Sequence, residues 1–346
     1  MTECVTLRVP EIIQLSIKGL ATNMNRRELL RKSAMLAVAA GVPAVLVLDG
    51  CSDRGQSQAG KLERPDRAAD SPSPLPPPGS GSLPVAFVIS KAAEVLDFCG
   101  PLEVFAAAST KDGKPLFAPY MVASTMEPVV VGGGMRVLPD HTFKTAPAPK
   151  VIVIPAQTGE TPEMIDWIRS ASKTTDLTMP VCTGAFVLAK TGLLNGKSAT
   201  THHGGYYRLE ANFPEIHLKR GARFVEDGNI ASAGGISSGI DLALRLVERY
   251  AGREQALEVA DLMEYQGKGW LNPNSNEAYS KLPPFTEEHP VCPVCLMRGD
   301  RSIKASYKGK TCYFCSEDEK DFFEKHTDVF DRFLAEDAAR KSGSSD

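Results

Sequence analysis

Short apolar runs alternate with helical patterns along the middle of this 346-residue chain, and this alternation constrains the fold more than any other feature. The runs are rich in β-branched residues, as in "VAFVIS" (85–90), "VIVIP" (151–155) and "RFVEDGNIASA" (223–233). Segments between them, such as 238–250, place apolar residues three or four positions apart, which is typical of an amphipathic helix. The alternation predicts an α/β domain with a mostly parallel sheet flanked by helices. We expect its chemistry at the carboxyl ends of the strands.

The first 51 residues predict an export signal that is separate from the folded domain. The basic stretch "NRRELLRK" (25–32) precedes an apolar stretch that is too short to span a membrane comfortably. Arg26 and Arg27 resemble the paired arginines of a twin-arginine signal. We therefore expect an exported bacterial protein that is periplasmic or faces the periplasm. An ordinary amphipathic helix is the alternative interpretation of this segment.

The stretch "LDGC" (48–51) resembles a bacterial lipobox in which Asp49 replaces a small uncharged residue. Two alternatives stay open: a lipid on Cys51 that tethers the protein to the membrane, and no lipid. Met24 stands where such a signal would begin, so translation from the first residue and from Met24 are both open.

Residues 52–83 are polar and then proline-rich, with too few apolar side chains to offset the entropy of ordering them, so we expect a disordered linker. The formal net charge of the whole chain is −3, which gives no basic field that would attract nucleic acid. We therefore expect no nucleic-acid partner.

The stretch "VCTGAF" (181–186) places Cys182 at a sharp turn from a strand into a helix. The free N–H groups and partial positive charge of a helix start favour the thiolate, which predicts a lowered pKa for this thiol. Such a turn also exposes the sulfur. We expect the backbone N–H groups of Thr183 and Gly184 to face the charge that develops on a substrate. The alternative is that Cys182 is a small buried hydrophobe.

The stretch "LDFCGPLEVF" (96–105) places Asp97 at the start of the helix that follows the first strand. This carboxyl group lies at the same sheet edge as Cys182, where it can bond to the sulfur or transfer a proton. Helix capping is the alternative. Cys99, two residues later, is expected to be buried filler. The glycine-dense stretch "AGGISSGIDLAL" (233–244) predicts another turn into a helix at this edge.

Three stretches in this order and spacing, "EVLDFCGPLEVF", "VCTGAFVLAKTGLLNGKSATTHH" and "AGGISSGIDLALRLVE", resemble the ThiJ/PfpI superfamily. The resemblance assigns residues 84–272 to one domain and implies a flavodoxin-like, class I glutamine-amidotransferase-like fold. The subgroup most similar is that of isonitrile-hydratase-like proteins, which also occur as sensing halves of transcription regulators. Because relatives are often dimers, the resemblance also implies a homodimer.

The resemblance implies a small-molecule substrate or ligand, and a reaction in which a cysteine thiolate attacks an electrophilic carbon, an acid delivers a proton, and water releases the product. Mapped onto this sequence, Cys182 is the nucleophile, Asp97 is the acid or base, and Thr183 contributes hydrogen bonds. No cofactor is required at this site. At the position of His203 the family usually has an aromatic residue other than histidine. The role of the histidine pair, His202 and His203, therefore stays open. The residues expected to contact substrate are Gly100, Gly184, His202, Gly235, Ser237 and Asp241.

Two other functions are left open by the sequence. The stretch "GISSG" (235–239) matches the G-x-S-x-G pattern and would make Ser237 the nucleophile of a serine hydrolase. The required downstream histidine would have to be His289 or His326, and both lie outside the expected core. The other alternative is a binding or sensing protein in which Cys182 reports oxidation without turnover.

Residues 273–290 are expected to form a second linker before a cysteine-rich module at 291–338. Two Cys-x2-Cys pairs, separated by sixteen residues, predict a site for zinc or another thiophilic divalent metal. The module also resembles the YHS family of small metal-binding modules, in which a further cysteine commonly stands at the position of Glu319. Two disulfides are the alternative. The expected metal ligands are Cys292, Cys295, Cys312 and Cys315.

Overall fold

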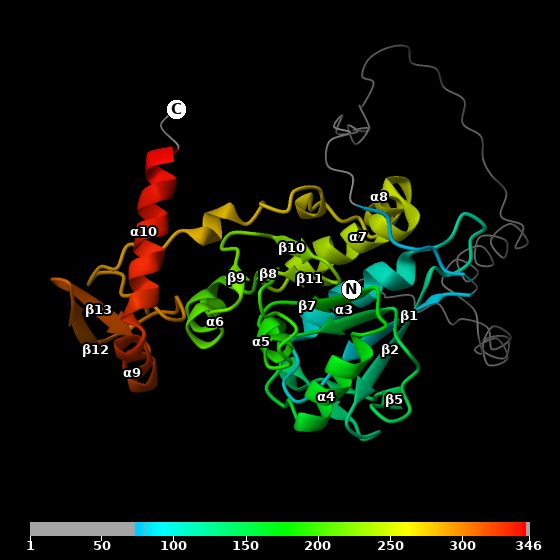
Figure 1. Cartoon of the computed structure of the whole chain (residues 1–346), viewed down its shortest axis with the longest axis horizontal. Coiled ribbons are helices and arrows are strands. Elements are labelled where there is room, and N and C mark those ends of the chain that lie inside the picture. Colours follow the sequence, from blue (N-terminus) through cyan, green and yellow to red (C-terminus); the bar gives the residue numbers. More distant parts are fainter. Residues whose placement is uncertain (1–72, 80, 344–346) are drawn as a thin grey trace, which may run out of the picture. The chain divides into compact units, whose positions relative to one another are not determined.

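The computed structural model describes residues 73–79 and 81–343 (Figure 1). The described residues all belong to one compact unit of the chain. The export signal and the lipid site at Cys51 lie outside the described residues, as does most of the linker expected at 52–83. In the part that is described, no helix is both long enough and apolar enough to cross a membrane.

A seven-stranded sheet forms the centre of the described unit, with the strand order β10-β11-β7-β6-β1-β2-β5. All neighbouring pairs are parallel except β10 and β11. This confirms the predicted α/β fold class. The strands are β1 (Leu83–Val88), β2 (Phe117–Ala123), β5 (His141–Thr142), β6 (Val151–Ile154), β7 (Leu177–Pro180), β10 (Phe224–Asp227) and β11 (Ile230–Ala233).

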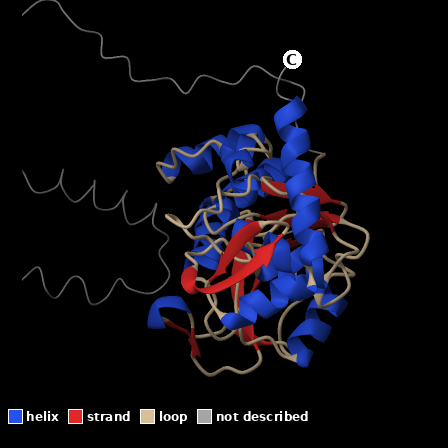
Figure 2. Cartoon of the chain, turned by 90° about the vertical axis from the view of Figure 1, so that its left-hand side faces the viewer, coloured by secondary structure: helices blue, strands red, loops and turns tan. Residues whose placement is uncertain are grey.

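Helices cover both faces of this sheet (Figures 1 and 2), because alternate residues of its strands are apolar on both sides. In β1, Val85 and Phe87 pack with α3, α7 and α8 on one face. Ala86 and Val88 pack with α4 and α5 on the other. The helices are α3 (Val95–Ala107), α4 (Pro162–Ala171), α5 (Gly184–Ala189), α7 (Ser238–Ala251) and α8 (Arg253–Leu262).

The run at 223–233, expected as one strand, is instead the antiparallel hairpin β10–β11. Gly228 stands between the two strands with a φ of +64°, which a glycine adopts without strain. The chain therefore reverses here, and β11 rather than β10 pairs with β7.

Shorter elements connect the main ones. Two small two-stranded sheets pair β3 (Val129–Val130) with β4 (Arg136–Val137) and β8 (Ser198–Ala199) with β9 (His217–Leu218). The remaining short elements are η1 (Gly132–Gly134), η2 (His203–Gly205), α6 (Tyr206–Asn212), η3 (Gly269–Leu271) and η4 (Glu277–Ser280).

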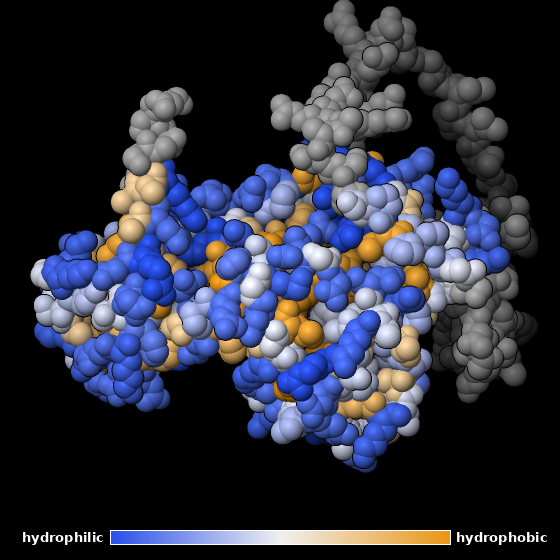
Figure 3. Space-filling view, viewed as in Figure 1, coloured by the Kyte–Doolittle hydropathy of each residue, from blue (hydrophilic) through white to orange (hydrophobic). Residues whose placement is uncertain are grey.

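The C-terminal cysteine-rich region folds as a hairpin followed by two helices. Strands β12 (Asp300–Tyr307) and β13 (Lys310–Phe314) pair antiparallel, and α9 (Glu317–Lys325) and α10 (Thr327–Gly343) follow them. The apolar cluster of this region includes Phe314 and Phe323, and it also takes in Tyr206 and Tyr207 from α6. On the face of the molecule in Figure 3, hydrophobic side chains form small patches among hydrophilic ones.

The turn from β7 into α5 brings the backbone of α5 close to the end of β6. A Cβ atom on Gly184 would lie 2.0 Å from the carbonyl oxygen of Ile154, which is closer than any side chain tolerates. Gly184 therefore acts as a packing residue that allows α5 to start directly over the sheet.

Replacing Gly184 with alanine should lower the free energy of unfolding by about 2–3 kcal/mol, because the added methyl group has no space against the backbone of β6. Urea denaturation of the variant measures this change. Gly79→Ala is the matched control, since a Cβ at that glycine has no atom within 4 Å. Equal stability of the two variants would contradict the proposed close packing.

Candidate active site

Cys182 lies at the sharp turn between β7 and α5 that the sequence predicts. Its φ is +57°, in the left-handed region that a non-glycine residue adopts only at a cost of about 1 kcal/mol or more. Hydrogen bonds hold the strained backbone in place. Its N–H group donates to the carbonyl oxygens of Ala233 (3.2 Å) and Gly234 (3.0 Å) at the end of β11. Its carbonyl oxygen accepts from Oγ1 of Thr201 at 2.8 Å.

The thiol of Cys182 is buried, with 6% of the residue exposed. Burial, with a smaller contribution from the negative charge of Asp97, raises the pKa of this thiol to about 12. The backbone N–H groups of Thr183 and Ile236 donate toward the sulfur, and these hydrogen bonds oppose the rise in pKa. The expectation of an exposed thiol with a lowered pKa is wrong, because the loss of hydration outweighs the helix-start N–H groups.

Asp97 is fully buried in the first turn of α3. Its Oδ2 accepts a hydrogen bond from the backbone N–H of Ala156 at 2.9 Å, just beyond β6. Among the described residues, its Oδ1 has no hydrogen-bond partner. Glu94 occupies the N-cap of α3, so the helix-capping interpretation of Asp97 is wrong. Burial, with a smaller contribution from Glu94, raises the pKa of Asp97 to about 7, which lets the carboxyl group hold or release a proton near neutral pH.

A cavity of about 290 Å³ has Ile236 in its lining, while Cys182 and Asp97 themselves do not line it. Ile236 connects the cavity to Cys182, because its backbone N–H points at the sulfur of Cys182 and the residue lines the cavity. Three of the expected substrate-contacting residues line it: His202, Gly235 and Ser237. The full lining consists of Leu96, His202, His203, Tyr206, Arg223, Gly235, Ile236, Ser237, Asn276 and Tyr279.

The histidine pair contributes neutral rings to the cavity. Nδ1 of His202 accepts from the backbone N–H of Gly204 at 3.1 Å, which leaves the proton of the neutral ring on Nε2. Burial, with a smaller contribution from the nearby His203, lowers the pKa of His202 to about 4. Burial also lowers the pKa of His203. Both rings are therefore uncharged at neutral pH and can take part in hydrogen bonds without adding charge to the wall.

Arg223 is a cavity residue that the sequence analysis missed. Its guanidinium donates to Oδ2 of Asp241 (2.7 Å), Oδ1 of Asn276 (3.2 Å) and Oγ of Ser237 (3.0 Å). Its positive charge is thus paired within the protein. A lone arginine beside an apolar run carries no sequence signal for this role, because its partners are distant in the chain.

Asp241 was expected to shape the cavity wall, and this expectation is wrong. Its carboxylate is fully buried and accepts hydrogen bonds from Arg223, from the hydroxyl of Tyr265 (3.0 Å) and from the backbone N–H of Trp270 (2.9 Å). Its oxygens are occupied in fastening α7 to the segment that follows α8.

Ser237 lines the cavity, but its geometry differs from that of Cys182. Its φ is −67°, in the ordinary helical region, so it lacks the strained backbone of a nucleophile elbow. Within residues 81–343, the hydroxyl bonds to Arg223 rather than to a histidine. This arrangement disfavours the serine-hydrolase alternative.

Two glycines expected at the substrate lie in packed interfaces instead. A Cβ on Gly100 would lie 2.8 Å from Ile240, so this glycine lets α3 pack against α7. Gly184 packs against β6, as described above, and neither glycine lines the cavity. Thr183 is half-buried, and its side chain makes no capping hydrogen bond to α5. Cys99 is partly buried against the core, as expected.

In the C-terminal region, three of the four predicted metal ligands lie together. The sulfur atoms of Cys292, Cys295 and Cys315 are all within 4.8 Å of one another, and Cys295 and Cys315 are 3.4 Å apart. Cys312 lies outside this group, because it is buried in the apolar cluster on β13. No disulfide joins these four cysteines in the structure. Three converging sulfurs suit a thiophilic divalent metal.

This cysteine cluster lies close to the segment that carries the histidine pair. A Cβ on Gly204 would lie 2.7 Å from the carbonyl oxygen of Cys295. In the following helix α6, the hydroxyl of Tyr207 donates to the carbonyl oxygen of His326 at 2.6 Å. Arg208 pairs with Glu319 at 2.9 Å. The C-terminal region therefore supports one side of the cavity.

The fold and the site define an α/β protein with a cysteine at a strained strand-to-helix turn. Residues 84–249 match the DJ-1/PfpI family. The chain is 34% identical over 189 residues to the isonitrile hydratase of Pseudomonas putida, covering 53% of this chain and 79% of that protein. The chain belongs to the DJ-1/PfpI family.

Other relatives include proteins that are not enzymes by name. The chain is 21% identical to the HTH-type transcriptional regulator GbdR of Pseudomonas aeruginosa, over 56% of this chain and 53% of the regulator. It thus spans about half the length of that relative. Among solved structures, a THiJ/PfpI family protein from Pseudomonas syringae aligns with a TM-score of 0.49 and 26% identity, covering 54% of this chain and 77% of that one.

Replacing Asp97 with asparagine should accelerate alkylation of Cys182 at about pH 9, because the carboxylate that raises the thiol pKa is removed. In the unchanged protein, the rate should rise with pH and reach no plateau below about pH 10. Iodoacetamide labelling followed by mass spectrometry of the Cys182 peptide measures both rates. Cys99 is the internal reference. A plateau near neutral pH, or a slower rate in the variant, would contradict this account.

Proposed function

We propose that this protein is a cysteine-dependent hydratase or hydrolase that acts on small electrophilic molecules, with isonitriles as the substrate class. The observation that carries the proposal is the buried Cys182, which interacts with Asp97 and is linked through Ile236 to a cavity large enough for a small molecule. The 34% identity to an isonitrile hydratase supports this substrate class.

The proposed reaction adds water to the isonitrile in two steps. First, the sulfur of Cys182 bonds to the terminal carbon of R–N≡C while that carbon gains a proton, giving the thioimidate R–N=CH–S–Cys. Water then adds to the same carbon, the C–S bond breaks, and R–NH–CHO leaves as the thiol is restored. The net change is one water consumed, with no oxidant or reductant.

Asp97 is suited to carry the proton in both steps. Because burial raises its pKa to about 7, its neutral and charged forms are both accessible near neutral pH. It can protonate the substrate carbon and recover a proton from the thiol, whose own pKa is raised by burial. The N–H groups of Thr183 and Ile236 support the negative charge that develops on the sulfur.

The cavity favours an uncharged substrate. The guanidinium of Arg223 is already paired with Asp241, and the histidine pair is neutral at neutral pH. A charged ligand would lose hydration without finding a free counter-charge among these groups. Small isonitriles meet this requirement, and His202 presents a ring N–H that can bond to the substrate or to water.

A binding or sensing role is the second candidate function. The buried Cys182, with its raised pKa, is a weak nucleophile at rest, and several relatives are transcription regulators. Under this alternative, the cavity holds a ligand without turnover.

Turnover of a small alkyl isonitrile to the formamide, followed by infrared loss of the isonitrile band, separates these candidates. Cys182→Ala should lower kcat/KM at least about a thousandfold, because the covalent step is removed. Ser237→Ala should lower kcat/KM at most about tenfold, which is the effect of one lost hydrogen bond. Comparable losses in the two variants would contradict the assignment of the nucleophile, and no turnover by the unchanged protein would favour the sensor.

We also propose that the C-terminal region is a YHS-like module that binds zinc or another thiophilic divalent metal. Its support is the group formed by Cys292, Cys295 and Cys315. Hydrogen bonds from Cys295 and from backbone N–H groups lower the pKa of Cys292, which favours the thiolate form that a metal ligand needs. When bound, the metal would supply a cross-link between the first cysteine pair and the end of β13.

We further propose that the protein is exported, that it is tethered by a lipid and that it forms a homodimer. Export to the periplasm and a lipid tether at Cys51 rest on the sequence of residues 25–51 alone. A homodimer rests on the resemblance to dimeric relatives.

Purified protein should contain about one zinc ion per chain, and Cys295→Ser and Cys315→Ser should each lose most of it. Cys312→Ser is the control and should retain the metal, because its sulfur lies outside the group. Elemental analysis measures the content. Retention of zinc by both of the first two variants would overturn the assignment of the ligands.

A further inference from the structure

We infer that Tyr279 is a specificity-determining residue that limits the bulk of the substrate at the mouth of the cavity. This inference rests on the proposed function of the Cys182 site. Tyr279 belongs to η4, in the segment expected as a linker, and lies beyond residue 249, where the family match ends. Substrate selection would thus depend on a part of the chain outside the family domain.

The ring of Tyr279 forms part of the cavity lining. It stacks on His203 with ring centroids 4.9 Å apart and an angle of 28° between the planes. His203 in turn lies 4.1 Å from the ring of His202. These three rings, which we call the ring stack, form a continuous aromatic wall beside the cavity. The outermost ring is that of Tyr279.

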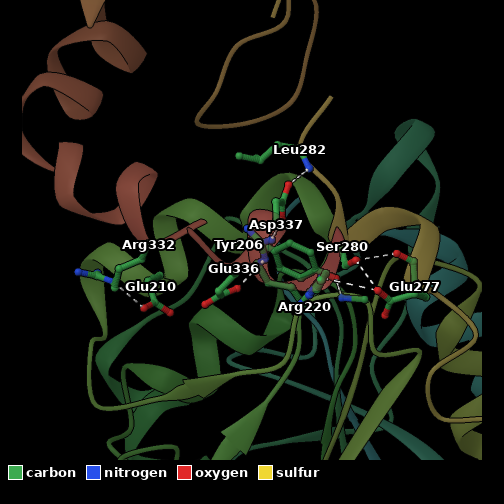
Figure 4. A network of polar contacts seen from close by, with 11 residues as sticks. Tyr206, Glu210, Arg220, Glu277, Ser280, Leu282, Arg332, Glu336 and Asp337 are labelled. Atoms are coloured by element: carbon green, nitrogen blue, oxygen red, sulfur yellow. Dashed lines mark hydrogen bonds and ion pairs between the residues drawn. The ribbon is translucent and has the colours of Figure 1, made fainter. Parts of the chain in front are cut away.

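The segment that carries this ring is held by hydrogen bonds on both sides of η4. Before it, Nδ2 of Asn276 donates to the hydroxyl of Ser238 at 3.3 Å, and its Oδ1 accepts from Arg223. After it, the backbone N–H of Leu282 donates to Oδ2 of Asp337 in α10 at 2.8 Å (Figure 4). Tyr279 is therefore held between two tied points of the chain.

The second anchor is itself buried and charged. Asp337 forms an ion pair with Arg220, whose guanidinium also lies over the ring of Phe333, 4.1 Å from its centroid. Figure 4 shows Asp337 between Arg220 and Leu282. Arg220 is buried, so this pairing is costly to break and keeps the segment in place.

Core packing does not account for an aromatic residue at this position. Tyr279 is 53% exposed, which makes it one of the most exposed large hydrophobic residues in the described chain. Loss of its ring would remove little buried surface but would open one side of a cavity of about 290 Å³. A substituent on the substrate that meets this ring would then have free space.

The test compares a small and a bulky substrate, methyl isonitrile and cyclohexyl isonitrile. Tyr279→Ala should change the ratio of their kcat/KM values by at least about tenfold in favour of the bulky one, and Tyr279→Leu should change it less. Tyr279→Phe keeps the ring and should leave the ratio within about twofold. Leu262→Ala, at another exposed apolar residue, is the matched control. An unchanged ratio in Tyr279→Ala would overturn the inference.

A second measurement keeps the inference separate from the proposed function. Alkylation of Cys182 by iodoacetamide and by its N-cyclohexyl derivative reports access to the sulfur without turnover. Tyr279→Ala should favour the bulky reagent here too. If no isonitrile is consumed but this ratio shifts, the proposed function fails and the inference stands. If isonitriles are consumed and neither ratio shifts, the inference fails and the proposed function stands.

Discussion

The left-handed backbone of Cys182 is the constraint on which the candidate site depends. Its N–H group bonds to the end of β11, its carbonyl oxygen bonds to Thr201, and Gly184 lets α5 begin directly against β6. The contacts at β11 and β6 come from the strands on either side of β7 in the sheet, and Thr201 lies outside that sheet. The parallel sheet therefore does more than support the turn, because it supplies the fixed points that keep a strained conformation populated.

Burial has opposite consequences for the two groups at this turn. It makes Cys182 a poorer thiolate, since the thiol pKa rises to about 12. It makes Asp97 a better proton donor near neutral pH, since the carboxyl pKa rises to about 7. This arrangement does not favour a reaction that requires a permanently ionised thiolate. It does favour a reaction in which formation of the bond to sulfur is coupled to delivery of a proton.

The sequence predicts what is local, and the structure adds what is not. Apolar runs and helical spacing predict the α/β class, and a strand followed by small residues predicts the turn at Cys182. The run at 223–233 reads as one strand because both arms of its hairpin are similar in composition. The positions of Arg223 and Tyr279 escape detection, since each depends on partners far away in the chain. Asp241 shares a motif with Ser237 but faces a different direction, which no spacing reveals.

Tyr206 and Tyr207 belong to α6 of the family domain, yet both pack in the apolar cluster of the C-terminal region. Tyr207 is only 1% exposed there. A protein truncated after the family domain would expose both aromatic rings to water, and the resulting hydrophobic patch would favour aggregation. We therefore expect the two regions to need each other when the protein is expressed, because each covers apolar residues of the other.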